Sequence, residues 1–162
     1  MKFEQIKPLI LFFPILLVQI FFIPLISIEG IAPDLILMLL VFYTLKNGQL
    51  YGTILGFIFG LFFDFISGGI IGSMMFSKTL SGFLAGYFFN ENKIDLHFNS
   101  FSYPLIVLLV SIIDSITISL VTSFDINTNI VTLFFYQGLL PGIYTSALCF
   151  FITFFYPKRS YI

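Results

Sequence analysis

The chain alternates between long apolar stretches and short breaks that contain polar residues, glycine or proline. The breaks separate six apolar stretches, at residues 8–26, 33–46, 50–67, 70–89, 102–123 and 131–156. A helix needs about 20 apolar residues to cross the ~30 Å hydrocarbon core of a bilayer. Most of the stretches meet that length. We therefore predict an all-α integral membrane protein, with six transmembrane helices in one domain that covers residues 1–162.

The second stretch is short and has a well-marked start. Residues 33–46 would form about 21 Å of helix at ~1.5 Å per residue, so this helix needs a thin membrane or shielding by its neighbours. Pro33 suits the first helical position, and Asp34 complements the positive end of the helix dipole. The sequence Lys46-Asn47-Gly48-Gln49 predicts a tight turn and an antiparallel hairpin, and Ser67-Gly68-Gly69 predicts a second tight turn.

Composition supports a lipid environment. The chain is 59% hydrophobic and 9% charged, whereas a soluble domain carries roughly 25% charged residues. Its mean hydropathy is +1.08. The net charge of −1 argues against nucleic acid as a partner. The first stretch contains Pro14 and Pro24 and has no small-x-small cleavage site, so we expect a retained first span rather than a cleaved signal peptide.

Basic residues occupy alternate breaks. With both termini in the cytoplasm, the three outer breaks hold no Lys or Arg and carry the acids Glu29 and Asp125. The inner segments then hold Lys2, Lys7, Lys46, Lys93, Lys158 and Arg159. Cytoplasmic loops of membrane proteins are enriched in Lys and Arg, and Tyr favours the interfaces, where most of the tyrosines fall. We predict six spans with both ends inside.

Small residues recur along the third and fourth stretches. Gly52, Gly56 and Gly60 lie at four-residue intervals, on one face of a helix that ends at Asp64. The fourth stretch adds the small residues Ser77, Ser81, Gly82, Ala85 and Gly86. Small residues let membrane helices approach closely. These faces predict packing between helices of the chain, which is the simpler interpretation, or a groove for a partner helix. The short second span is another candidate site for docking a partner.

Three ionisable residues lie within the apolar stretches: Asp64, Lys78 and Asp114. An unpaired charge at the bilayer centre costs at least ~2.5–3.5 kcal/mol, so we expect partners or a wet cavity. The depths of the residues favour a Lys78–Asp64 pair, since helical side chains lean toward the helix N-terminus. Asp114 is then expected to be hydrogen-bonded among serines or protonated. A proton or ion pathway is the alternative use of these groups.

The sequence offers little for catalysis. His97 lies in a predicted inner loop with no second ligand nearby, and Cys149 lies in an apolar run where it suits a core position. No serine is placed beside a histidine base, and no glycine-rich phosphate loop with a lysine is present. We expect no enzyme activity, no metal and no cofactor.

The order of features resembles the MreD family of bacterial rod shape-determining proteins over nearly the whole chain. The strongest segment is the glycine series that leads through Asp64 to Ser67 and Gly68. Lys78 has no counterpart in the family pattern. The other matching positions are Gln19 in the first span, Pro33 and Asp34 at the start of the second, Gly72, Asp114 in the fifth and Pro141 in the sixth.

The resemblance implies a non-enzymatic scaffold of the cell-elongation complex in the bacterial cytoplasmic membrane, which supports peptidoglycan synthesis. It implies a fold similar to the substrate-binding S-components of energy-coupling-factor transporters. It also implies that the chain binds the transmembrane helix of MreC and, through MreC, is linked to MreB, RodA and a penicillin-binding transpeptidase.

A substrate-binding subunit of a vitamin-type transporter is the alternative function. Such a subunit should have outer loops that cap a cavity, and the break at residues 67–70 is too short for a lid.

Overall fold

The computed structural model describes residues 7–68, 70–90, 102–122, 135 and 139–155. Over these residues the regular structure is helical, apart from an isolated bridge between Ile28 and Ile31. The helices are α1 (Lys7–Phe21), α2 (Ile23–Ile26), α3 (Leu35–Asn47), α4 (Gln49–Ser67), α5 (Ser73–Ala85), the 3₁₀ helix η2 (Gly86–Phe88), α7 (Ser102–Thr122) and α9 (Leu140–Phe155). The predicted all-α class is confirmed for the described chain.

The helix boundaries follow the apolar stretches with local differences. The first stretch is broken at Phe22, because Pro24 has no N–H to donate to the preceding turn and its ring crowds that turn. Pro33 was predicted to be the first helical residue of α3. It instead lies outside the helix, directly before the N-cap residue. Asp34 is extended and its side chain accepts a hydrogen bond from the Leu37 N–H at 2.8 Å, which makes Asp34 the N-cap. Residues 131–134 and 136–138 of the sixth stretch lie outside the described residues.

Glycines form the two predicted turns. Gly48 has φ of 96° and its N–H donates to the Thr44 carbonyl, which ends α3 and allows α4 to begin one residue later. Gly68 caps the C-terminus of α4 with φ of 67°. Both angles lie in the left-handed region that glycine adopts without a steric cost. These turns reverse the chain direction between α3, α4 and α5.

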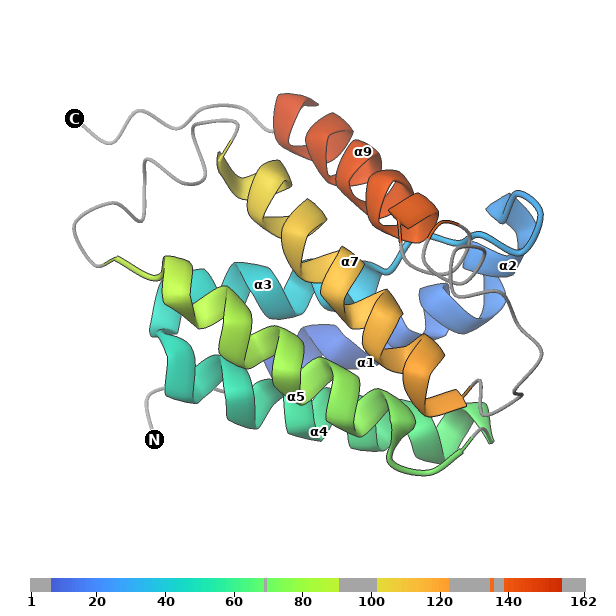
Figure 1. The fold of residues 1–162 in the computed structure, drawn as a ribbon, viewed down its shortest axis with the longest axis horizontal. Coiled ribbons are helices and arrows are strands. Elements are labelled where there is room, and N and C mark those ends of the chain that lie inside the picture. The colour runs from blue at the N-terminus through green and yellow to red at the C-terminus, as the bar shows by residue number, and fades with distance from the viewer. Residues whose placement is uncertain (1–6, 69, 91–101, 123–134, 136–138, 156–162) are drawn as a thin grey trace.

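The helices run back and forth between two ends of the bundle (Figure 1). The turn at Gly48, the start of α1, the start of α7 and the end of α9 lie at one end. The segment after α2 and the connection from α4 to α5 lie at the other end. Lys7 and Lys46 therefore share one end, and Glu29 lies at the opposite end. This sharing of ends is what the predicted topology requires.

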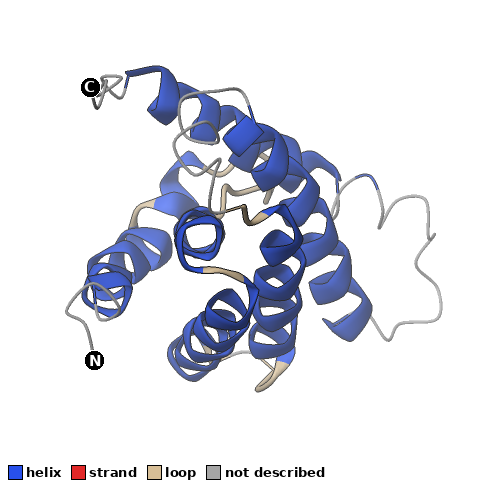
Figure 2. Cartoon of the chain, turned by 90° about the vertical axis from the view of Figure 1, so that its left-hand side faces the viewer, coloured by secondary structure: helices blue, strands red, loops and turns tan. Residues whose placement is uncertain are grey.

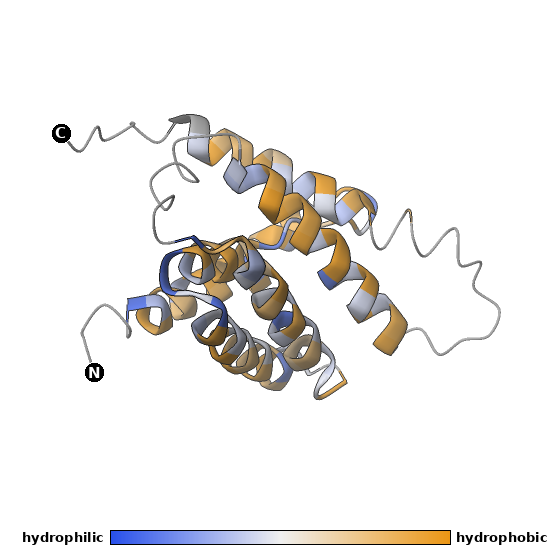
Figure 3. Cartoon of the chain, turned by 60° about the vertical axis from the view of Figure 1, so that its left-hand side comes forward, coloured by the Kyte–Doolittle hydropathy of each residue, from blue (hydrophilic) through white to orange (hydrophobic). Residues whose placement is uncertain are grey.

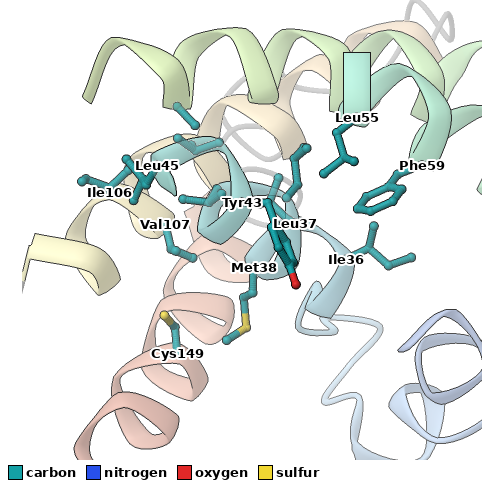
Figure 4. Packing of buried hydrophobic residues seen from close by; sticks show 14 of the residues in the cluster. Ile36, Leu37, Met38, Tyr43, Leu45, Leu55, Phe59, Ile106, Val107 and Cys149 are labelled. Carbon is teal, nitrogen blue, oxygen red and sulfur yellow. The ribbon is translucent and has the colours of Figure 1, made fainter. Parts of the chain in front are cut away.

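Helix α3 is the centre of the bundle. Figure 2 views the bundle nearly end-on and shows α3 enclosed by the other helices, and α3 contacts α1, α4, α5, α7 and α9. Figure 4 shows its apolar side chains between Leu55 and Phe59 of α4 on one side and Val107 of α7 and Cys149 of α9 on the other. The neighbouring helices therefore shield α3, as one of the two expectations for this short helix required.

The outside of the bundle is also apolar (Figure 3). Large hydrophobic side chains are exposed on its outer helices, among them Phe21, Leu25, Leu50, Leu120 and Phe151. By length and composition, α4 and α7 could each cross a membrane, while α1, α3 and α9 are shorter apolar helices. An apolar exterior over an apolar core is consistent with a membrane protein.

Candidate functional site: a glycine interface and a buried ion triad

The glycine faces of α4 and α5 pack directly against each other. A Cβ atom added at Gly56 would overlap the backbone carbonyl of Lys78, and one at Gly82 would overlap the carbonyl of Gly52. Gly60 and Gly86 are equally close to Met74 and Gln49. Close approach of this kind gives membrane helices their dispersion contacts. The small residues therefore join α4 to α5.

This packing corrects the partner-groove interpretation of these faces. The face with Gly52, Gly56 and Gly60 is filled, partly by Thr44 of α3 and otherwise by α5. Helix α3 is also enclosed by its neighbours. In the described structure the glycine face is thus occupied by the chain's own helices, and α3 is largely enclosed, although its Phe42 is exposed. A periodic pattern of small residues looks the same whether the helix that it receives belongs to the chain or to a partner.

Asp64 satisfies the N-terminus of the next long helix. Its carboxylate accepts hydrogen bonds from the backbone N–H groups of Gly72, Met74 and Met75 at 2.8, 3.1 and 3.0 Å. It also lies 3.4 Å from the Ser73 hydroxyl. The first N–H groups of a helix have no partner within the helix, and lipid offers none. Asp64, buried near the end of α4, thus caps α5 from outside that helix.

Lys78 lies between two other carboxylates. Its Nζ donates to Asp34 Oδ2 and to Asp114 Oδ2, each at 2.5 Å, and this ion triad joins α5 to α3 and α7. Asp114 Oδ1 accepts hydrogen bonds from the hydroxyls of Ser77 and Ser81 at 2.6 and 2.8 Å.

The predicted Lys78–Asp64 pair is wrong. The Lys78 side chain points away from α4 because Asp34 and Asp114 meet it across the α3–α5–α7 junction. Asp64 needs no cation, since helix N–H groups carry partial positive charge and satisfy it. Asp114 is hydrogen-bonded to serines, which was one of the two alternatives expected, but these serines belong to α5 rather than to its own helix. Its ion pair with Lys78 was not predicted.

Asp34 was not recognised from the sequence as an ion-pair partner. It was predicted to complement the start of α3, and it does cap that helix. The sequence did contain one signal for this pair, namely the depth of the two residues in the membrane. Asp34 begins its helix at the outer end, and the Lys78 side chain leans toward the same end. Only the packing of α3 against α5 shows that the reach is used.

The remaining matched positions surround Asp34 or shape the turns. The amide of Gln19 donates to the Pro33 carbonyl and accepts from the Leu35 N–H, at 3.0 and 2.9 Å. Gly72 precedes α5 with φ of 101°. Pro141, in the first turn of α9, accepts a hydrogen bond from the Thr145 hydroxyl, which in turn accepts from the Asp34 N–H.

The described residues contain no group of three His, Cys, Asp or Glu side chains that could hold a metal ion. Cys149 is fully buried, as predicted. His97 and Lys93 lie outside the described residues.

Compared with known protein families, residues 3–159 match the family described as rod shape-determining protein MreD. The comparisons with curated proteins and with solved structures gave no match.

Proposed function

The chain belongs to the MreD family of rod shape-determining membrane proteins, and from this premise we propose that it is a multi-pass scaffold of the cell-elongation complex in the bacterial cytoplasmic membrane. The observation that carries the proposal is the family match over residues 3–159 of the 162-residue chain. In this proposal all six apolar stretches cross the membrane, with both termini in the cytoplasm.

The proposed partner is the transmembrane helix of MreC, which would link the chain to MreB, RodA and a penicillin-binding transpeptidase. The bundle supports a docking role through its apolar outer helices, whose exposed side chains can pack on another helix as well as on lipid. Because the glycine face of α4 and most of α3 are enclosed, the docked helix would contact outward faces of α1, α4 or α9.

The test combines cell shape with partner capture. Loss of the chain from its rod-shaped host should give rounded cells, and re-expression should restore the rods. Tagged protein purified from that host's membranes should retain MreC. Normal rods without the chain, or purification without MreC under conditions that preserve other membrane complexes, would contradict the proposal.

A substrate-binding subunit with the S-component fold is the other function considered from the sequence. Among the described residues, each buried side-chain nitrogen or oxygen already has a hydrogen-bond partner within the chain. The polar groups thus give this alternative no specific support. A small molecule that co-purifies at one per chain would support it over the scaffold.

A further inference from the structure

The segment between α2 and α3, residues 27–34, is held to the bundle by side chains from several helices. We call this segment the outer strap. The strap turns back on itself through the Ile28–Ile31 bridge, with positive φ at Glu29 and Gly30. Its end is held by Gln19 of α1, by Thr145 of α9 and by Lys78 of α5. Each of these attachments is polar and falls at residues 33–35.

The two carboxylates of the ion triad are not equivalent. The Asp114 side chain is 3% exposed and lies deep between α5 and α7, whereas the Asp34 side chain is 26% exposed and belongs to the strap. Asp114 also accepts hydrogen bonds from two serines of α5, so these serines hold its side chain in place independently of Lys78. Asp34 is therefore the member of the triad that can leave toward solvent.

Charge balance allows this departure. One lysine and two carboxylates give the triad a net charge of −1, since +1 − 2 = −1. Without Asp34, the buried remainder is the neutral Lys78–Asp114 pair. A buried charge is tolerated when it is paired and hydrogen-bonded. Released Asp34 would still cap α3 through the Leu37 N–H, and its second oxygen would be hydrated. Both arrangements leave the charged groups satisfied.

We propose that the outer strap is a movable element fastened by Lys78. The structure shows the fastened state, in which Asp34 completes the triad. In the released state the strap lifts away from Lys78 and also gives up the bond of Gln19 to the Pro33 carbonyl, while Lys78 stays with Asp114 and the α5–α7 junction remains closed. Release would also separate the Asp34 N–H from Thr145 and so uncouple the strap from α9. A partner that binds the strap from the outer side would thus change how α9 is held. The proposal does not depend on the scaffold function.

Hydrogen exchange of the full-length protein in lipid nanodiscs tests the proposal. The main variant is Lys78→Met with Asp114→Asn, which removes the fastening and leaves no unpaired charge between α5 and α7. Exchange in peptides that cover residues 27–38 should rise at least tenfold, while peptides from residues 102–122 should change less than twofold. Asp34→Asn keeps an N-cap side chain and should give the same selective rise. Lys46→Met, at the opposite end, is the matched control and should change neither region.

Three outcomes would overturn the proposal. Unchanged exchange in residues 27–38 would show that Lys78 does not fasten the strap. A similar rise in residues 27–38 and 102–122 would show that the triad holds the whole bundle rather than the strap. If the double variant does not fold, the Asp34→Asn variant alone provides the test. A hydrogen-exchange rate that does not increase in residues 27–38, or that increases in all helices, would then contradict the proposal.

Discussion

At the scale of single residues, the buried acids show that similar side chains can be satisfied in different ways. Asp64 receives backbone N–H groups of α5, whereas Asp114 receives a lysine and two serines. The choice depends on which donors lie nearest. At the end of α4 these are the free N–H groups of a helix N-terminus, and at the middle of α7 they are side chains of α5. An acid within an apolar stretch can therefore be a cap rather than an ion-pair partner.

The cap at Asp64 leads to a stability prediction. Asp64→Ala should lower the free energy of unfolding by about 2–4 kcal/mol, because the N–H groups that it accepts from would lose a charged acceptor in a buried place. Unfolding in mixed detergent micelles would measure this loss. Asp64→Asn keeps one oxygen acceptor and should lose roughly half as much. Equal stability of the alanine variant and the natural chain would show that the cap contributes nothing.

At the scale of elements, the glycine-lined faces make α4 and α5 the most closely packed pair in the described chain. At Gly56, the backbone of α5 at Lys78 occupies the space that a side chain on α4 would need. Helix α3 is stabilised differently, since its buried apolar side chains contact helices on several sides. These two arrangements explain why the faces that suggested partner docking are internal.

The glycine contact predicts a loss of folding rather than a selective loss of binding. Gly56→Leu should destabilise the chain by about 3 kcal/mol or more, since larger side chains in packed positions cost about 1–3 kcal/mol and here the obstacle is backbone. Thermal unfolding in detergent would measure the effect. Ile54→Leu, on the exposed face of the same helix, is the control and should be neutral.

The same variant separates the two interpretations of the glycine face. If the Gly56→Leu chain is as stable as the natural chain but no longer retains MreC, the glycine face is a docking site for MreC. A destabilised chain whose folded fraction still retains MreC would assign the face to internal packing.

At the scale of the whole molecule, the arrangement of helix ends supports the proposed orientation. The described basic residues Lys7 and Lys46 lie at one end of the bundle, and Glu29 lies at the other. Lys78 lies in the interior and is paired with the carboxylates of Asp34 and Asp114, so it is not counted as a loop residue in the orientation argument. The proposed orientation, with the Gly48 turn in the cytoplasm and the outer strap outside, agrees with the positive-inside rule.

Cysteine labelling in whole cells checks this orientation. In a Cys149→Ala background, Ile28→Cys should react with a membrane-impermeant maleimide in intact cells. Asn47→Cys should react only after the membrane is opened. Both positions are exposed, so a difference between them reports the side of the membrane rather than burial. Labelling of the cysteine at position 47 in intact cells would show that the Gly48 turn lies outside the cell and would contradict the proposed topology.

The amino-acid sequence by itself determined the membrane class, the family, the approximate helix ranges and the turns at Gly48 and Gly68. These features depend on local hydropathy, on short-range backbone preferences and on spacing along one helix. It also indicated that Cys149 is buried and that Asp114 lies among serines.

Only the tertiary structure decided which charges meet and which faces remain free. A lysine side chain can reach carboxylates in several directions, so the partners of Lys78 depend on how α3 and α7 pack beside α5. Likewise, the amides that Asp64 caps belong to another helix. Hydropathy and spacing describe one helix at a time, whereas an ion pair or a cap between helices is fixed by distances that exist only after the helices have packed.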